Sequence, residues 1–460
     1  MAATGEYTQF HGGTVSAALA AIVTAVNRVN QIYGRDLAIL FQLIGNNDAI
    51  IYTNPATDPY TNNDGTAMLL ENQANLDSVI GSANYDIGHV FSTGGGGIAG
   101  VGVTCINNFK AQGVTGSPSP EGDSFYIDLV AHELGHQLDA DHPFNGTEGA
   151  CLSGRVAVSA VEPGSGSTVM SYAGICGAEN LQSSSDAHFH AWSMRQIVAY
   201  SQSAGCGTVV TTGNTAPINV TAGADFSIPA NTAFALLGSA SDAEGDVLSY
   251  QWDEMDANGT ATTAATLGRD LGDNPLFRSF LPKDTPLRTF PRLSRLLDDI
   301  SDPGETLPVT DRVLNFRFTV RDGDSGVDED DMRITVVSSA GPFAIDEPVT
   351  SGLASGQQLP IAWDVAATDI VPIACANVDI HLLSFNSTRS SYCENALVLA
   401  TPNDGAQSVS LQADHGTSRG RIRVRCSDNI FFDINNSDLV VNAPTQANTD
   451  CISTDGTVLE

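Results

Sequence analysis

The stretch that decides the fold of this chain is AHELGHQLDADH, residues 131–142. It places His132, Glu133, His136 and His142 in the order HExxHxxxxxH. On a helix, His132 and His136 lie one turn apart on the same face, so both imidazoles can bind one zinc ion. Glu133 then lies beside the metal, where it can take a proton from a water activated there. His142 can complete three protein ligands and leave a fourth position open, which is typical of a catalytic zinc.

Chance and a structural zinc site account for this stretch less well. An HExxH match arises by chance in roughly one chain per hundred of this kind, and a third histidine at a fixed offset lowers that about fiftyfold. An exposed amphipathic helix with scattered histidines is therefore disfavoured. A structural zinc site prefers four closed ligands, often cysteines, and this stretch contains no cysteine.

A second segment, STVMSYAGICG at residues 167–177, supplies Met170 and Tyr172. The pattern HExxHxxGxxH followed by a Met-turn is the signature of the metzincin zinc peptidases, and the two segments resemble the bacterial reprolysin-like branch of that family. The resemblance implies that Met170 forms a turn beneath the zinc-binding histidines. It also implies that Tyr172 ligates zinc or stabilises an oxyanion. Packing of Tyr172 in the wall of the turn is the alternative.

One position departs from the family pattern, because Asp139 stands where glycine is usual. That glycine lets the chain leave the helix with a positive φ, so that the third histidine can reach the metal. Aspartate and asparagine tolerate the left-handed region best among other residues. We therefore expect the turn to form with some strain, with Asp139 and Asp141 as fallback oxygen ligands if His142 does not bind.

The resemblance also implies a substrate-binding edge. The glycine-rich segment at residues 94–105 lacks the GxxxxGK[ST] pattern of a phosphate loop. In metzincins, the strand before the active helix is a sheet edge that pairs with the substrate backbone. A bulged edge without a substrate role is the alternative. The expected contacts are Gly97, Ile98, Ala99, Gly100 and Val101 on the edge, and Ala173, Gly174 and Ile175 in the pocket wall.

Composition restricts the class of protein. A chain of 460 residues is too long for one ordinary core. Its net charge of −33 argues against nucleic acid or an anionic membrane as a partner. We find no apolar run long enough to span a bilayer and no signal peptide, and we expect a signal peptide and propeptide to be missing from this sequence. The predicted protein is a secreted monomer that acts on a protein or peptide substrate.

The chain has eight cysteines in two groups of four, which favours disulfides within domains and an oxidising compartment. Similarity to reprolysins implies Cys105–Cys206 and Cys151–Cys176. The pairing of the four later cysteines is open, with Cys375–Cys393 and Cys426–Cys451 as one arrangement.

Local patterns predict the elements of the first domain. Apolar periodicity predicts a helix over residues 14–34, and the short apolar run 36–44 predicts a buried strand. A helix over residues 65–80 begins after Asp64 as its N-cap, a strand covers residues 85–92, and a closing helix covers residues 186–202. Asp123 is a candidate cap for the active helix. His188 and His190 lack zinc-ligand spacing, so we expect them to pack or to lie on the surface.

After residue 206 the pattern changes to short alternating apolar runs, which are typical of β-sandwiches. The predicted fold class is multidomain: an α/β (α+β) metzincin-like catalytic domain with a mixed twisted sheet, followed by two all-β immunoglobulin-like sandwiches. The predicted domains are a zinc peptidase at residues 1–206, a linker at 207–217, a PKD- or cadherin-like sandwich at 218–338, a second sandwich at 341–445 and a tail at 446–460. An insertion at about 262–310 is locally basic and aromatic, and docking within the chain is favoured over binding of an acidic substrate.

Two acidic loops of the first sandwich are candidate calcium sites, because clustered carboxylates suit a cation that takes six to eight oxygens. Solvated acidic turns are an equal alternative. The residues are Asp242, Glu244 and Asp246 in one loop, and Asp322, Asp324 and Asp328 in the other.

These observations predict a secreted zinc-dependent endopeptidase with Glu133 as the general base. One rival is an adhesin or matrix-binding protein whose peptidase domain mainly processes itself. The other is a metal site without catalysis, which Glu133 argues against because a binding-only site needs no base.

Overall fold

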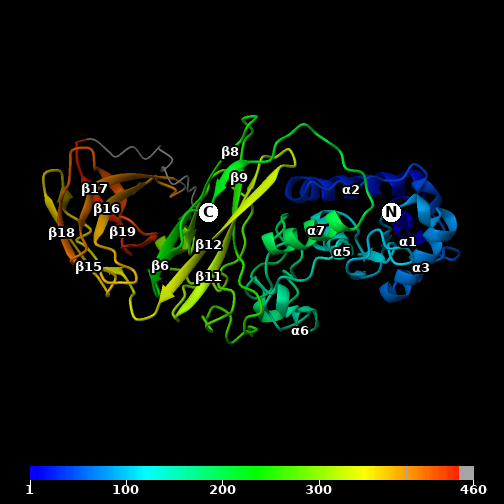
Figure 1. Ribbon diagram of the computed structural model, residues 1–460, viewed down its shortest axis with the longest axis horizontal. Coiled ribbons are helices and arrows are strands. Elements are labelled where there is room, and N and C mark those ends of the chain that lie inside the picture. The colour runs from blue at the N-terminus through cyan, green and yellow to red at the C-terminus, as the bar shows by residue number, and fades with distance from the viewer. Residues whose placement is uncertain (390, 445–460) are drawn as a thin grey trace.

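The chain folds into a helical N-terminal domain followed by a β-rich region, as the computed structural model shows (Figure 1). The structure describes residues 1–389 and 391–444. The N-terminal domain lies at one end of an elongated molecule, strands β9, β11 and β12 lie in the middle, and strands β15 to β19 lie at the other end (Figure 1). The expected tail at 446–460, with Cys451, lies outside the described residues.

The N-terminal domain combines helices with four short strands. Its elements are β1 (Ala2–Ala3), α1 (Gly5–Phe10), α2 (Val15–Leu37), η1 (Asn47–Ile50), α3 (Gly65–Val79), η2 (Ser82–Asn84), β2 (Val90–Ser92), β3 (Gly96–Ala99), β4 (Gly113–Gly116), α4 (Asp123–Phe125), η3 (Tyr126–Ala131), α5 (His132–Gln137), α6 (Cys151–Gly154), η4 (Ala157–Ser159), η5 (Gly177–Glu179) and α7 (Ala191–Ser203).

The strands form a sheet in the order β1-β2-β4-β3, in which β1, β2 and β4 are parallel and β3 pairs antiparallel with β4. This confirms the predicted mixed sheet and places the glycine-rich strand β3 at its edge. The helix that carries the histidines runs through α4, η3 and α5, and η3 is π-helical. Such wide turns often occur at functional sites.

Helix α2 is the central helix of this domain. Its buried stripe, which includes Ile22, Val26, Val29 and Tyr33, shares a core with Leu134 of α5. By length and composition α2 could cross a membrane, contrary to the expectation that no such run exists. One face of the helix packs in the domain core, as expected of a core helix.

The predicted end of α2 and the strand predicted after it are wrong. The helix does not stop at Gly34 but continues to Leu37, with Ala38 in the left-handed conformation as its C-cap. The run 36–44 forms no strand. The side chain of Asn30 accepts a hydrogen bond from Phe41 N and donates one to Phe41 O. These bonds occupy backbone groups that a neighbouring strand would otherwise pair with.

Helix ends were predicted with mixed success. Asp64 caps α3, because its side chain accepts from Ala67 N. Asp123 does not cap the active helix, since its carboxylate binds Arg28 at 2.9 and 2.8 Å. The closing helix begins at 191 rather than 186, because His190 caps it by accepting from Trp192 N. The predicted strand 85–92 shrinks to β2.

The β-rich region contains seventeen named strands among the described residues. They are β5 (Ile218–Thr221), β6 (Phe226–Pro229), β7 (Ala233–Leu237), β8 (Ser239–Ser241), β9 (Ser249–Glu254), β10 (Leu287–Phe290), β11 (Arg312–Arg321), β12 (Val327–Val337), β13 (Ala344–Ile345), β14 (Leu353–Ala354), β15 (Gln358–Asp364), β16 (Asn377–Phe385), β17 (Tyr392–Pro402), β18 (Ala406–Ser410), β19 (Thr417–Cys426), β20 (Phe431–Ile434) and β21 (Leu439–Asn442), with the short helix α8 (Leu293–Asp298) after β10.

The two β-domains are joined by one sheet. The first has a sheet in the order β6-β12-β11-β9, whereas its strands β7 and β10 continue into the order β10-β7-β20-β19-β16-β17. Strand β7 pairs with β20, so that Phe234 lies opposite Phe431 across the expected domain boundary. One apolar core extends through both domains. The two β-domains therefore share a sheet and an apolar core.

The disulfides implied by the resemblance, Cys105–Cys206 and Cys151–Cys176, are present. The expected arrangement Cys375–Cys393 and Cys426–Cys451 is wrong in both pairs, because Cys375 pairs with Cys426. Cys375 lies just before β16, and Cys426 ends the antiparallel neighbour β19 opposite Val378. Cys393 instead lies opposite Ser384, near the far end of β16.

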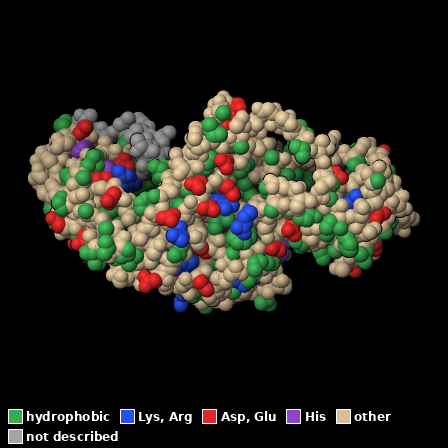
Figure 2. All heavy atoms as spheres, in the orientation of Figure 1, with side chains coloured by type: hydrophobic (Ala, Val, Ile, Leu, Met, Phe, Trp, Pro, Cys, Tyr) green, Lys and Arg blue, Asp and Glu red, His purple; other side chains and the backbone are tan. Residues whose placement is uncertain are grey.

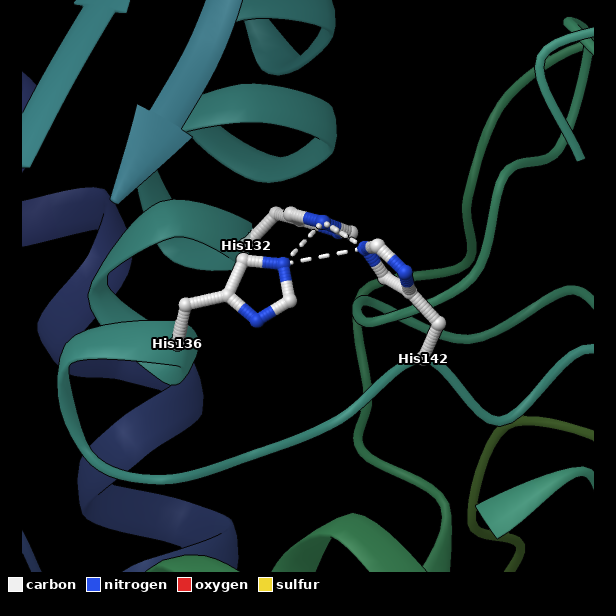
Figure 3. Close-up of side chains that lie close together, drawn as sticks. All are labelled: His132, His136 and His142. Carbon is white, nitrogen blue, oxygen red and sulfur yellow. Dashed lines mark hydrogen bonds between the residues drawn. The ribbon is translucent and has the colours of Figure 1, made fainter. Parts of the chain in front are cut away.

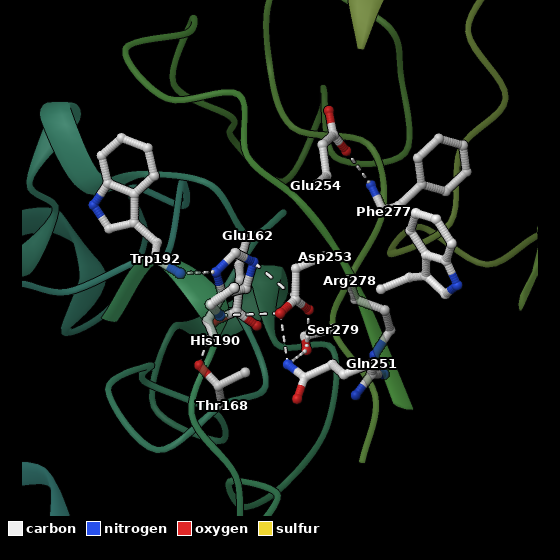
Figure 4. Close-up of polar contacts among 12 residues, drawn as sticks. Glu162, Thr168, His190, Trp192, Gln251, Asp253, Glu254, Phe277, Arg278 and Ser279 are labelled. Atoms are coloured by element: carbon white, nitrogen blue, oxygen red, sulfur yellow. Dashed lines mark hydrogen bonds and ion pairs between the residues drawn. The ribbon is translucent and has the colours of Figure 1, made fainter. Parts of the chain in front are cut away.

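The insertion of the first β-domain docks against the N-terminal domain. Ser279 of the insertion bonds to the N-terminal domain through His188 Nε2 on its hydroxyl and Ser167 Oγ on its carbonyl. Within its own domain, Ser279 Oγ donates to Asp253 and accepts from Gln251 (Figure 4). Lys and Arg side chains gather over the middle of the molecule (Figure 2). In the insertion, Arg278, Arg288 and Arg292 form ion pairs with acidic neighbours. Docking within the chain, the favoured expectation, is therefore observed.

Candidate metal centre and active site

Three histidines meet at one point of the N-terminal domain. His132 and His136 project from α5, and His142 reaches them from the following loop (Figure 3). Their Nε2 atoms lie 3.0 Å (His132 to His136), 3.2 Å (His132 to His142) and 3.0 Å (His136 to His142) apart. Four-coordinate zinc with Zn–N bonds of about 2.0–2.1 Å requires nitrogens roughly 3.3 Å apart, so the triad fits such an ion closely.

The proton positions in the triad follow from its outer hydrogen bonds. Each Nδ1 lies against a backbone carbonyl: His132 against Val169 O at 2.9 Å, His136 against Ala140 O at 2.7 Å, and His142 against Gly154 O at 2.6 Å. A carbonyl only accepts, so each Nδ1 must carry the proton and each Nε2 must present a lone pair. The Nε2 atoms therefore cannot hydrogen-bond to one another, and a cation is what satisfies them.

The histidines are held in the neutral form that binds metal. Burial first, and then the neighbouring imidazoles, lower the pKa of His136 to about 3 and that of His132 well below its usual value. Burial also lowers the pKa of His142. A metal ligand must be deprotonated at the coordinating nitrogen, and these imidazoles meet that condition at neutral pH.

The turn to the third histidine forms as expected. Asp139 adopts φ 73°, the left-handed conformation that glycine takes in the family pattern. Its backbone N–H donates to His136 O, which closes the end of α5. The carboxylate of Asp141 binds Ser159 and Gln196. The fallback oxygen ligands are not needed to complete the triad.

The segment around Met170 supports the triad from below. Met170 is fully buried, and its Sδ would lie 2.3 Å from a Cβ at Gly135, so only glycine fits between the first and second histidine at that point. The preceding Val169 provides the carbonyl that orients His132. Buried Glu162 fixes this turn by accepting from Ser167, Thr168 and Ser171.

Glu133 follows His132 on α5 and lies against the sheet edge. Its Oε1 would be 2.4 Å from a Cβ at Gly97, so strand β3 passes directly against the carboxylate. Oε2 is buried and accepts no hydrogen bond from the described residues. Burial raises the pKa of Glu133 to about 8. A carboxyl with a raised pKa beside a metal triad suits proton transfer.

Tyr172 lies beside two of the three histidines. Its ring centroid is 4.4 Å from that of His142 and 5.6 Å from that of His132. Burial, and then the charge of Glu133, raise its pKa to about 12. The phenol therefore remains a hydrogen-bond donor at neutral pH.

The predicted substrate residues lie on accessible surfaces around this site. Gly97, Ile98 and Ala99 pair with β4 through one edge, whereas residues 100 and 101 lie beyond the strand. In the wall segment, Ala173 is half-buried, and Gly174 and Ile175 are exposed. Their roles in substrate binding stay a prediction.

The acidic loops lie far along the chain from this site. Asp242 Oδ1 accepts from three backbone N–H groups of its own loop, including that of Asp246. Asp322 Oδ1 likewise accepts from Asp324 N. Across residues 1–389 and 391–444, these carboxylates do not bring three ligand atoms within 4.8 Å of one another. Glu244 binds Thr215, and Asp328 binds the backbone of Glu329. Calcium stays a prediction.

Sequence reasoning did not find the residues that orient the triad. The carbonyls of Val169, Ala140 and Gly154 leave no signal in the residue types. Glu162 does carry a signal in the sequence, because it is a lone carboxylate among small residues before the Met-turn.

Comparison with known proteins finds a family match for the N-terminal domain. Residues 1–200 match the model of the reprolysin-like metallo-peptidase family M12B. None of the curated proteins matches the chain. Among solved structures, the tandem Ig repeats of Dlar match with 9% identity, 50% of this chain, 100% of that chain and a TM-score of 0.26. The Ig1-2 module of a Drosophila receptor tyrosine phosphatase matches with 9% identity, 49% and 98% coverage and a TM-score of 0.25. These scores are too low to assign a fold to the β-domains, whose description rests on their own strands.

Proposed function

We propose that this chain, whose residues 1–200 form a reprolysin-like domain of metallo-peptidase family M12B, is a secreted zinc-dependent endopeptidase of extracellular proteins. The family itself implies zinc metallopeptidase activity. The observation that carries the finer proposal is the set of three Nε2 lone pairs that converge beside the buried carboxylate of Glu133. A binding-only site has no need of that carboxylate.

The residues around the triad divide the chemistry between them. When bound, zinc supplies Lewis-acid activation of the attacking water and of the scissile carbonyl. Glu133 removes a proton from the water and later gives it to the leaving amine nitrogen. Tyr172 donates a hydrogen bond to the oxygen that becomes negative. The substrate backbone extends along the free edge of β3, and residues 173–175 contact the side chain beyond the scissile bond.

The proposed location follows from the disulfides. Three disulfides join described residues, and two of them brace the peptidase domain. Such bonds persist in oxidising compartments outside the cytosol. We propose that the protein acts there as a monomer.

The deciding experiment compares the parental protein with Glu133→Gln, and uses Glu121→Gln, a change at an exposed carboxylate, as the matched control. Zinc content and cleavage of unfolded casein are measured together. We expect one zinc per chain in all three proteins and cleavage lowered about 10²- to 10⁴-fold in Glu133→Gln alone. Full cleavage by Glu133→Gln would remove it as the base. Parental protein that cuts only its own chain would favour the self-processing adhesin.

A further inference from the structure

The residue that orients the third histidine belongs to a segment that the first β-domain holds. Residues 143–157, here called the post-triad segment, follow His142 directly and include α6. Gly154 at the end of α6 accepts the hydrogen bond from His142 Nδ1 at 2.6 Å. A Cβ at Gly154 would lie 2.9 Å from Tyr172 Cε2 and 3.0 Å from Phe144 Cζ. Gly154 is therefore packed tightly against the site on one face, and its other attachments decide where its carbonyl points.

Two attachments hold the post-triad segment. On one side, the disulfide Cys151–Cys176 ties the start of α6 to the chain after the Met-turn. On the other side, Arg155 follows Gly154 directly. Its guanidinium donates to Asn145 Oδ1 at 3.0 and 2.8 Å and to Gly259 O of the first β-domain at 2.8 Å.

Residues 258–262, here called the anchoring loop, make further bonds to the same segment. Asn145 Nδ2 donates to Thr260 O at 2.9 Å, and Thr262 N donates to Asn145 O at 3.2 Å. Thr147 Oγ1 donates to Thr262 O at 2.7 Å. Asn145 is fully buried, so breaking these bonds would leave buried polar groups without hydrogen-bond partners, which is costly.

The anchoring loop is itself rigidly placed within the β-domain. A Cβ at Gly259 would lie 2.1 Å from Asp273 O, so the loop tip is in backbone contact with the insertion. Thr260 N also donates to Asp273 Oδ1 at 3.0 Å. The anchoring loop, itself fixed within the β-domain, therefore contacts the segment that contains the hydrogen-bond partner of His142.

We propose that the first β-domain is part of the support of the metal centre: the anchoring loop, through Arg155 and Asn145, positions the Gly154 carbonyl and with it the imidazole of His142. Arg155 is therefore a positioning residue, since it contacts neither metal nor substrate. The inference rests on the proposed function only in taking the triad to bind zinc. Partners of metal ligands orient the ring and raise its basicity, so losing the support should loosen the metal.

The test uses two pairs of variants in the zinc-loaded full chain. Arg155→Met removes the guanidinium that donates to the anchoring loop. Its control Arg278→Met removes another interdomain guanidinium, which binds Gln182 and lies 3.7 Å from Asp186, away from the post-triad segment. Gly259→Ala displaces the loop from within the β-domain. Its control Gly238→Ala creates a similar overlap, 2.4 Å from the Phe318 ring, in the same domain.

Two readouts separate positioning from simple loss of stability. The first is the rate of zinc release to a chromogenic chelator, and the second is the visible absorption spectrum of the cobalt-substituted protein, both measured well below the melting temperature. We expect Arg155→Met and Gly259→Ala to release zinc about 10-fold faster and to alter the cobalt spectrum. The two controls should lose comparable stability but keep the parental rate and spectrum.

The result that overturns the proposal is a parental release rate and spectrum in both Arg155→Met and Gly259→Ala. Equal acceleration in the controls would also overturn it, because any loosening of the β-domain would then suffice. A parental protein that binds no zinc would contradict both this inference and the proposed function. A parental protein that binds zinc without cleaving peptides would contradict the proposed function alone.

Discussion

At the scale of the residue, Asp139 shows how a departure from a family pattern can keep the geometry. Its φ of 73° is the conformation that glycine takes readily, and aspartate is among the few other residues that tolerate it. We expect Asp139→Gly and Asp139→Asn to keep full zinc content. Asp139→Val should lose about 1–3 kcal/mol of stability, because a β-branched residue is strained there. Thermal unfolding with zinc analysis checks this, and a Val variant as stable as the Asn variant would contradict it.

The chemistry-bearing residues of the site could be predicted from the sequence because helical spacing alone puts them together. His132, Glu133 and His136 need only one turn of helix, and His142 needs only the turn at Asp139. The carbonyl of Gly154 could not be predicted in this way. Any residue type offers a carbonyl, and its direction depends on contacts made by segments more than a hundred residues later.

At the scale of the element, strand β3 does more than present an edge, because it also closes the space around Glu133. A Cβ at Gly97 would lie 2.4 Å from Glu133 Oε1, whereas one at Gly95 would meet nothing within 4 Å. We expect Gly97→Ala to lower kcat for a peptide substrate about 10²-fold, since a shift near 1 Å in a catalytic group costs that much. Gly95→Ala is the matched control and should keep the parental kcat.

Zinc content distinguishes the two ways in which Gly97→Ala could fail. Retained zinc with low kcat would place the damage at Glu133, as the geometry predicts. Lost zinc would show instead that the edge strand supports the triad, and an unchanged kcat would show that Glu133 can move aside without penalty.

Elements whose own residues mark their ends and their periodicity were predicted well. Elements that depend on partners elsewhere in the chain were not. Asp64 and the periodic run after it were sufficient to predict α3. The run 36–44 has the composition of a strand, but Asn30 provides the hydrogen bonds that a strand neighbour would have made. Composition cannot reveal that a single side chain competes for these backbone groups.

At the scale of the whole molecule, a buried ion pair joins the peptidase domain to the first β-domain. Arg321 Nε lies 2.8 Å from Asp36 Oδ1, and both side chains are fully buried. Nη2 of Arg321 also donates to Gln251 Oε1 at 2.8 Å. No sequence pattern links residues 285 positions apart. The relative orientation of the domains therefore could not be predicted, although the type of each domain could.

Removing one partner of this pair should weaken the whole molecule. Arg321→Met leaves the Asp36 carboxylate buried with Arg35 and the backbone N–H of Phe189 as its partners, and we expect a loss of about 3 kcal/mol in the free energy of unfolding. The matched control is Arg333→Met, whose partner Asp225 lies 3.7 Å away and is more than half exposed. That surface pair should be worth less than about 1 kcal/mol. Equal losses in urea denaturation would contradict a special role for the buried pair.

The same pair predicts how stability depends on pH. Burial opposes ionisation of Asp36, but Arg321 and Arg35 outweigh it and lower its pKa below the usual value. A carboxyl whose pKa is lower in the folded state stabilises the protein fully above its unfolded pKa of about 3.9. This stabilisation is lost as the pH falls through the folded pKa, because the folded state must then take up the proton. The stability difference between the parental protein and Asp36→Asn should therefore be constant from neutral pH down to about pH 4 and shrink below it. Urea denaturation of both proteins across this range measures the difference directly, with Asp225→Asn as the exposed control. If the stability difference kept its neutral-pH value throughout the acid range, the ion pair between Arg321 and the Asp36 carboxylate would not be what stabilises the contact between the two domains.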